Sequence, residues 1–309
     1  MKLIKPKFWD RRYYSFLSLV LYPFSIIIDI RNFIYSFVKL KRYSQIKTIC
    51  VGNIYLGGTG KTPLVNFLAK KFKNKYKTVI IKKKYQSHLD EKKLLEKNNK
   101  VFFENDREVS LIRAIKNDYE LAIFDDGLQD KKILYDLKIV CFSSISLAGN
   151  QLRLPAGPLR EKLTNLKRYD AVFFVGYKTD KKFIKKIRKI NSKISIFSGE
   201  YVCVDYKKYK NGSYIVFSGI GNPKGFENTL KKYNIKFKSN LIYPDHYKYS
   251  ENDISKLKKI AKNKNLKLLT TEKDFYRIPT KLRKNIDYLK INLKINKQKE
   301  FNKFIVKYL

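Results

Sequence analysis

A lysine and a threonine follow a glycine-rich turn in the segment IYLGGTGKTP. The apolar run TICVGN precedes this turn and a helix-period stretch follows it, so we expect a strand to lead into the turn and a helix to leave it. Backbone N–H groups in such a turn point toward phosphate oxygens at the helix N-terminus. The segment therefore predicts a nucleotide-binding loop made of Gly57, Gly58, Thr59, Gly60, Lys61 and Thr62.

The two residues that end this loop have different expected roles. Lys61 would reach the β- and γ-phosphates, and the Thr62 hydroxyl would hold Mg²⁺. The usual pattern GxxxxGK[ST] has glycine at the position where this chain has Tyr55. We therefore expect a variant form of the phosphate loop.

A pair of carboxylates ends a second apolar run, in LAIFDDGLQD. If this run is a strand, Asp125 and Asp126 lie at the carboxyl edge of a parallel sheet, where a phosphate loop also lies. Mg²⁺ bound to a nucleoside triphosphate needs such an acidic partner. We therefore predict a metal site of Thr62, Asp125 and Asp126, although DDG alone is also a common turn sequence.

The elements that must position these residues form an alternating series. From residue 46 onward, short β-branched and aromatic runs alternate with helix-period stretches, which predicts an α/β protein with a parallel sheet covered by helices on both faces, followed by a second, smaller α/β domain. The expected strands are Ile46–Val51, Thr78–Ile81, Leu121–Phe124, Lys138–Phe142, Ala171–Val175, Tyr214–Ser218, Phe237–Ile242 and Lys267–Leu269. The expected helices are Pro63–Phe72, Arg107–Lys116, Lys224–Tyr233 and Glu251–Lys262. We place a nucleotide-binding domain at residues 43–205 and a C-terminal domain at residues 206–309.

An N-terminal segment, residues 1–42, has a different composition. Its run from Tyr13 to Ile28 carries no charge, but Pro23 interrupts it and it falls short of the roughly 20 apolar residues that a spanning helix needs. Basic residues flank the run, and Trp9 and Tyr13 suit a membrane interface. We predict a helix, or a broken pair of helices, that lies in the headgroup region, with a buried core helix and a single membrane span as the alternatives.

Composition limits the classes of function. The chain has 68 Lys and Arg against 27 Asp and Glu, a formal net charge of +41, which attracts polyanions such as nucleotides and anionic lipids. Lys, Ile, Asn and Tyr are abundant together, however, as drift toward A/T-rich codons also produces. The hydrophobic share of 44% argues against disorder. Each cysteine lies within a short apolar run and no CxxC occurs, which favours a reducing cytoplasm.

Several motifs occur in one order along the chain: VGNIYLGGTGKTP, DDGLQD, LPAGPLRE, SGIGNP, YPDHY and TTEKD, from Val51 to Asp274. Together they resemble the tetraacyldisaccharide 4'-kinase family. The resemblance implies a P-loop kinase-like fold and an enzyme that uses ATP and Mg²⁺ to phosphorylate the 4'-hydroxyl of a lipid A disaccharide 1-phosphate. It implies a peripheral or monotopic enzyme at the cytoplasmic face of the bacterial inner membrane. The expected partners are the glycolipid and an anionic membrane surface, with no nucleic acid and no obligate protein partner.

The resemblance also assigns roles to residues outside the phosphate loop. Gln129 matches the Gln that follows the family's DDGL core, and Asp130 stands where the family usually has His. Arg160 and Glu161, in LPAGPLRE, match residues at the edge of the family's active site. Arg160 could engage phosphate through its planar fork, and a structural ion pair is the alternative role.

The resemblance places the catalytic base in HLDEKKLLEK, where Asp90 aligns with an acidic residue of the family. The family's preceding glycine is replaced here by Leu89, so this stretch is divergent. His246, in YPDHY, matches a histidine that the family brings to its base. We therefore predict Asp90, His246 and Lys61 as the catalytic residues, with Asp90 and His246 acting as a proton-accepting pair. A surface role for Asp90 and a structural role for His246 are the alternatives.

Two other classes of function remain as competitors. A membrane-associated P-loop ATPase of transport or assembly type would use water as its phosphate acceptor. A nucleic-acid-binding protein would account for the charge alone, but no recognisable reading module occurs in the sequence.

Overall fold

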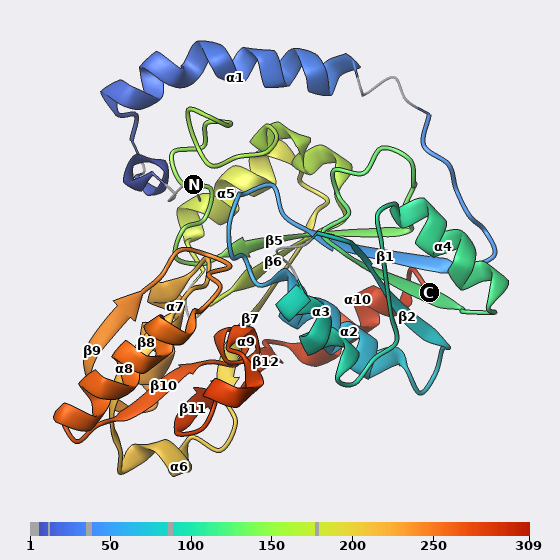
Figure 1. Ribbon diagram of the computed structural model, residues 1–309. Helices are drawn as coiled ribbons and strands as arrows, with labels where there is room; N and C mark the ends of the chain where they lie inside the picture. Colours follow the sequence, from blue (N-terminus) through green and yellow to red (C-terminus); the bar gives the residue numbers. More distant parts are fainter. Residues whose placement is uncertain (1–5, 12, 35–38, 86–88, 177–178) are drawn as a thin grey trace. The chain divides into compact units, whose positions relative to one another are not determined.

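The computed structural model describes residues 6–11, 13–34, 39–85, 89–176 and 179–309 (Figure 1). Contacts divide the chain into two compact units. The large unit comprises Lys5–Lys84, Leu95–Glu200 and Ile295–Leu309. The small unit comprises Tyr85–Leu94 and Tyr201–Lys294.

The large unit contains most of an eight-stranded sheet with the order β12-β7-β6-β5-β1-β4-β2-β3. Its strands are β1 (Lys47–Gly52), β2 (Thr78–Lys83), β3 (Val101–Glu104), β4 (Leu121–Asp125), β5 (Leu137–Ser143), β6 (Ala171–Val175), β7 (Ser195–Cys203) and β12 (Ile291–Ile295). The strand β1 pairs in parallel with β4 and with β5. The middle strands are mostly apolar and almost entirely buried because helices cover both faces of the sheet. The phosphate loop and the acidic pair therefore follow adjacent parallel strands.

Helices cover the two faces of this sheet in pairs. Aromatic contacts join α2 (Lys61–Phe72) to α10 (Gln298–Val306), because Phe67 and Phe301 lie with ring centroids 6.4 Å apart. The core cluster on the other face includes apolar side chains of α4 (Arg107–Lys116) and α5 (Lys181–Ile190). Short 3₁₀ helices occur at Lys7–Asp10 and Leu163–Arg168.

The small unit has its own four-stranded sheet, with the order β11-β10-β8-β9. Its strands are β8 (Ser213–Ser218), β9 (Lys236–Ile242), β10 (Lys267–Thr271) and β11 (Ile286–Leu289), and its helices are α3 (Leu89–Glu96), α6 (Lys207–Lys210), α7 (Pro223–Lys232), α8 (Glu251–Asn263) and α9 (Glu272–Arg277), with a 3₁₀ helix at Thr280–Leu282. The neighbouring strands pair in parallel. Apolar side chains of α7 and α8 belong to two separate clusters, so a helix covers each face.

The predicted fold class is confirmed, and each predicted strand and helix corresponds to an observed one. The expected series did not include β3, β7, β11 and β12, or the helices α3, α5, α6, α9 and α10. The division by contacts also differs from the expected domain limits, since Ile295–Leu309 groups with the large unit rather than with residues 206–294. The reason is packing: Phe301 is fully buried against Phe173 and Phe197 of the large sheet.

The N-terminal segment forms the helix α1 (Phe16–Ile34), which continues past Pro23. Its polarity is inverted relative to an ordinary surface helix, since Ser18 and Ser25 are fully buried while Phe16 is 83% exposed and Ile27 is 63% exposed. Among the helices that the structure describes, none combines the length and apolarity needed to cross a bilayer.

Candidate active site

The phosphate loop joins the end of β1 to the start of α2. Gly57 has a φ of 137° and Gly60 a φ of 83°, a range that side chains with a Cβ atom rarely adopt. The helix α2 begins directly after Gly60, at Lys61, so the free N–H groups of its first turn face the loop. The glycine turn between β1 and α2 is therefore present as expected, and its role in binding an anion stays a prediction.

Asn53 holds the loop in this shape. Its buried Nδ2 atom donates hydrogen bonds to the carbonyl oxygens of Tyr55 at 2.6 Å and Gly57 at 3.2 Å, and it lies 3.0 Å from Oγ1 of Thr59. The sequence analysis missed this residue. A buried amide that ends an apolar strand and begins a glycine turn was the available signal.

Tyr55, at the position where the usual loop has glycine, is only 2% exposed. Its hydroxyl donates a hydrogen bond to the carboxylate of Asp10, in the N-terminal segment. The next residue, Leu56, donates its N–H to the carbonyl of Pro158 at 2.8 Å. The buried side chain of Tyr55 therefore anchors the first turn of this variant loop, at the position where the usual loop has glycine.

Asp125 is the last residue of β4 and is fully buried. Its Oδ2 atom accepts a hydrogen bond from Oγ1 of Thr62 at 3.1 Å and lies 2.5 Å from Nζ of Lys82. Its Oδ1 atom has no hydrogen-bond partner among the described residues. A buried carboxylate oxygen with unused lone pairs beside a threonine hydroxyl suits a hard divalent cation such as Mg²⁺.

Asp126 follows in a left-handed conformation, with a φ of 64°. Oδ1 lies 3.5 Å from Nζ of Lys61, and both carboxylate oxygens accept hydrogen bonds of 3.1 Å from the guanidinium of Arg160. Burial would raise the pKa of this carboxyl, but the charges of Lys61 and Arg160 outweigh burial and lower the pKa to about 2. Burial lowers the pKa of Lys61, and Asp126 partly opposes this effect.

Gln129, Arg160 and Glu161 form one hydrogen-bonded chain. Oε1 of Gln129 accepts from Arg160 at 3.2 Å, and Nε2 donates to Glu161 at 2.9 Å. Glu161 also accepts from Asn165 and from the hydroxyl of Tyr169. The structure thus brings together all three residues, and Arg160 has the ion pair with Asp126 that was the alternative to a phosphate contact.

Asp130, at the position where the family usually has His, is mostly buried. Its side chain is 12% exposed and lies 3.4 Å from the guanidinium of Arg107. Arg107 also donates to the main-chain carbonyl of Asp126, the residue that follows Asp125. The sequence analysis did not single out Arg107 as a site residue, and only the folded arrangement shows that it reaches the acidic turn.

His246 lies in the small unit and has a φ of 57°. Its Nδ1 atom lies 3.3 Å from the guanidinium of Arg277, which also forms a 3.0 Å ion pair with Asp274. Asp90 lies in the first turn of α3, but its side chain lies outside the described residues. The pairing of Asp90 with His246 therefore stays a prediction.

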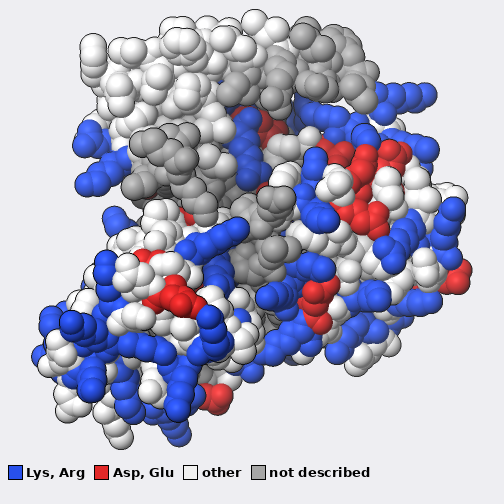
Figure 2. Space-filling view, in the orientation of Figure 1, with Lys and Arg blue, Asp and Glu red and all other residues white. Residues whose placement is uncertain are grey.

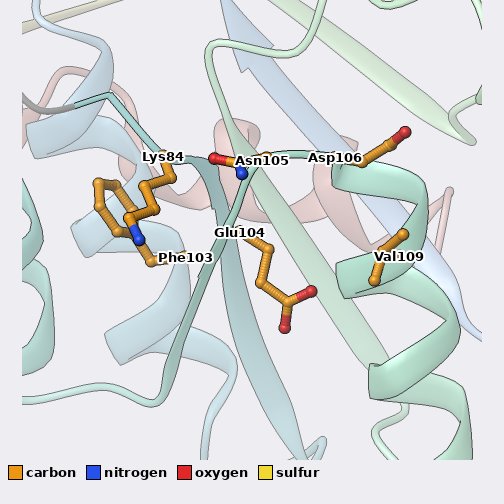
Figure 3. A pocket seen from close by; sticks show the side chains of 6 residues that line it. All are labelled: Lys84, Phe103, Glu104, Asn105, Asp106 and Val109. Atoms are coloured by element: carbon orange, nitrogen blue, oxygen red, sulfur yellow. The ribbon is translucent and has the colours of Figure 1, made fainter.

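A cavity of about 370 Å³ opens at the carboxyl ends of β2 and β3 (Figure 3). Its lining comprises Lys84, Phe103, Glu104, Asn105, Asp106 and Val109. Figure 3 shows Asp106, the residue before α4, and Val109 on α4, across from Lys84. Glu104 is ion-paired with Arg113, and Asp106 with Lys132, so both acids are engaged. The sequence analysis did not predict this pocket.

Comparisons with known proteins match this chain over nearly its whole length. A family model described as tetraacyldisaccharide-1-P 4'-kinase (LpxK) matches residues 14–309. A tetraacyldisaccharide 4'-kinase of Pelagibacter ubique is 46% identical and is aligned over 99% of this chain and 98% of its own length. One from Rickettsia felis is 35% identical, with the same shares covered. The crystal structure of LpxK from Aquifex aeolicus in complex with ATP is similar with a TM-score of 0.72 and 27% identity, over 94% of this chain and 99% of that one.

Proposed function

Because the chain belongs to the tetraacyldisaccharide-1-P 4'-kinase family, we propose that its phosphate loop and acidic pair form the catalytic centre of a lipid kinase. The protein is an ATP-dependent kinase that transfers the γ-phosphoryl group to the 4'-hydroxyl of a lipid A disaccharide 1-phosphate precursor. One observation supports the assignment of this site most directly. Lys61 lies next to Asp126, and Thr62 donates a hydrogen bond to Asp125.

In this site, residues 57–62 bind the triphosphate through backbone N–H groups, and Lys61 stabilises charge on the transferred group. Thr62, Asp125 and Asp126 would hold Mg²⁺, which would supply positive charge to neutralise the phosphate oxygens. No group of three or more His, Cys, Asp or Glu side chains that could hold a metal ion occurs in the part of the chain that the structure describes. Such a sparse protein shell is typical of Mg²⁺, which usually takes one or two carboxylates and the substrate's phosphates as ligands.

Arg160 supplies a further cation next to Lys61. Asp126 and Gln129 fix the orientation of its guanidinium, and Glu161 in turn fixes Gln129. A guanidinium that is already oriented loses less entropy when it contacts a phosphate than a freely rotating one does. We assign Arg160 to phosphate binding and assign Gln129 and Glu161 to its support.

Asp90 is proposed as the general base that accepts the proton of the sugar hydroxyl, with His246 as its hydrogen-bonding partner. The support comes from the family motifs and from the contact between Nδ1 of His246 and Arg277. Arginine only donates hydrogen bonds, so this contact makes Nδ1 the acceptor and leaves the proton of the neutral ring on Nε2. Nε2 is then able to donate to a carboxylate.

Membrane association is proposed through the helix α1 at the cytoplasmic face of the bacterial inner membrane, in a peripheral or monotopic mode. Figure 2 shows the outer surface of α1 as a band of uncharged atoms, while Lys and Arg spread over much of the remaining visible surface. The inner side of α1 is held by Arg153, which forms an ion pair with Asp29 and donates to the carbonyl of Ser25 at 3.1 Å. An apolar band next to basic surface suits an anionic bilayer.

Transfer of labelled phosphate from ATP tests this function. The purified protein, incubated with γ-labelled ATP and a lipid A disaccharide 1-phosphate in mixed micelles, should place the label in the lipid. The Asp90→Ala variant serves as the comparison and should label the lipid much more slowly. Label that appears only in free phosphate would contradict the proposal and favour an ATPase.

A further inference from the structure

A lysine that the phosphate-loop chemistry does not require lies inside the acidic site. Lys82 is the register partner of Asp125 across the parallel pair β2 and β4, so the two side chains emerge side by side. Nζ of Lys82 lies 2.5 Å from Oδ2 of Asp125, and the side chains are 5% and 0% exposed. Burial of an ammonium group costs desolvation free energy. A function at the neighbouring metal-site carboxylate would explain why Lys82 is buried here.

The carboxylate that Lys82 contacts is the one with the geometry of a metal ligand. Thr62 donates to the same Oδ2 atom, while Oδ1 has no hydrogen-bond partner among the residues that the structure describes. A divalent cation at Asp125 would therefore lie within a few ångströms of an ammonium group. Two cations on one buried carboxylate repel each other strongly at low dielectric constant.

The net charge of the whole cluster adds to this repulsion of a bare metal ion. Lys61, Lys82 and Arg160 outnumber the carboxylates Asp125 and Asp126, so the cluster has a net positive charge. A bare divalent cation would enter against this charge. A metal that arrives with a triphosphate brings net negative charge, and the same cluster attracts it.

We propose that Lys82 is a positioning residue that competes with the divalent cation for Asp125, so that the site takes up its metal with the nucleotide rather than alone. This inference rests on the proposed metal role of Asp125. Lys82 holds the carboxylate of Asp125 in place between turnovers. It also prevents a bare metal ion from filling the site ahead of the nucleotide.

The alternative is that Lys82 only neutralises a buried carboxylate. In both cases the loss of Lys82 destabilises the fold, because it leaves the charge of Asp125 unpaired. The two cases differ in their response to added metal. If Lys82 and the metal compete, a divalent cation replaces the lost ammonium and restores stability, whereas a purely structural ion pair gives no such rescue.

The test measures Mn²⁺ binding in the absence of nucleotide, by electron paramagnetic resonance of free Mn²⁺, on the full chain. Lys82→Met has a side chain of similar length without the charge, and it should bind Mn²⁺ at least about tenfold more tightly than wild type. Lys82→Arg and Lys83→Met should resemble wild type. Lys83 is the matched control because it is the next residue of β2 and points to the opposite face of the sheet.

Thermal unfolding gives the second readout. Mn²⁺ should raise the melting temperature of Lys82→Met more than that of wild type, and Asp125→Asn in the same background should abolish the difference. If Lys82→Met does not fold, Lys82→Gln provides the same test, since its amide donates to Asp125 without a charge. Neutral variants that bind Mn²⁺ no more tightly than wild type would overturn the inference. Failure of wild type to phosphorylate the lipid would instead overturn the proposed function, because the binding measurement does not depend on activity.

Discussion

Nζ of Lys61 lies 3.5 Å from Oδ1 of Asp126. These residues come from different elements, since Lys61 begins α2 and Asp126 directly follows β4. The parallel pairing of β1 with β4 places both strand ends at one edge of the sheet. The phosphate loop and the acidic pair therefore belong to one site.

Replacement of Lys61 by alanine should reduce kcat by about 10²–10³-fold, because it removes a preorganised charge that stabilises the transferred phosphoryl group. The loss should exceed that of Asp90→Ala. Steady-state transfer of labelled phosphate to the lipid measures both. Lys70→Ala is the control, since Lys70 is an exposed residue of the same helix. Near-normal turnover of Lys61→Ala would contradict the assigned site.

The lowered pKa of Asp126 should make part of the free energy of unfolding depend on pH. This pKa is lowered from 3.8 to about 2, so the ionised carboxylate contributes its full stabilisation above pH 3.8 and loses it as pH falls toward 2. The contribution amounts to about 2 kcal/mol. Urea unfolding should show that wild type loses about 2 kcal/mol more than Asp126→Asn over this pH range. Parallel pH profiles for the two proteins would refute the cause assigned here.

Tyr55 should be essential to the fold of the variant phosphate loop. Tyr55→Phe removes the hydrogen bond to Asp10 and should lower the free energy of unfolding by about 1–2 kcal/mol. Tyr55→Gly restores the usual motif but leaves a cavity, and should cost about 4 kcal/mol. Urea denaturation measures both changes. Tyr13→Phe is the control, because Tyr13 is 62% exposed, and it should leave stability unchanged. A more stable Tyr55→Gly variant would show that the loop prefers glycine.

The exposed apolar side of α1 should mediate binding to lipid. Ile27→Glu places a charge on this side and should weaken binding to anionic phospholipid vesicles by about tenfold or more, since it removes buried apolar area and adds repulsion. Vesicle co-sedimentation measures the change. Val306→Glu, at an exposed residue of α10, should bind as wild type does. Equal loss in both variants would indicate a charge effect that is not specific to α1.

Asp90 and His246 should act as a unit if they form the proton-accepting pair. Asp90→Asn and His246→Gln should each reduce kcat with little change in the KM for ATP, and the double variant should be no slower than the slower single one. Single-turnover phosphorylation of the lipid isolates the chemical step. Additive losses would mean that the two residues act independently, and full activity of Asp90→Asn would require another base.

The sequence determined the class of fold and the parts of the site that are local in the chain. The glycine loop, the strand before it and the helix after it are contiguous, so spacing and periodicity were sufficient to predict them. Arg107–Lys116 and Ala171–Val175 were predicted with the observed bounds because their patterns are regular. The weak or short strands, such as β3 and β11, carry too little periodicity to be separated from loops.

The tertiary structure decided which distant residues meet the loop. Lys82 and Arg107 stand in polar or basic sequence surroundings, and only strand register and helix packing bring them to the acidic turn. The contact of Tyr55 with Asp10 likewise joins segments that no local pattern relates. The physical reason is that the periodicity of a sequence indicates which face of a helix or strand is buried. The residue that a side chain contacts across the sheet depends instead on strand pairing and charge balance, which are properties of the whole fold.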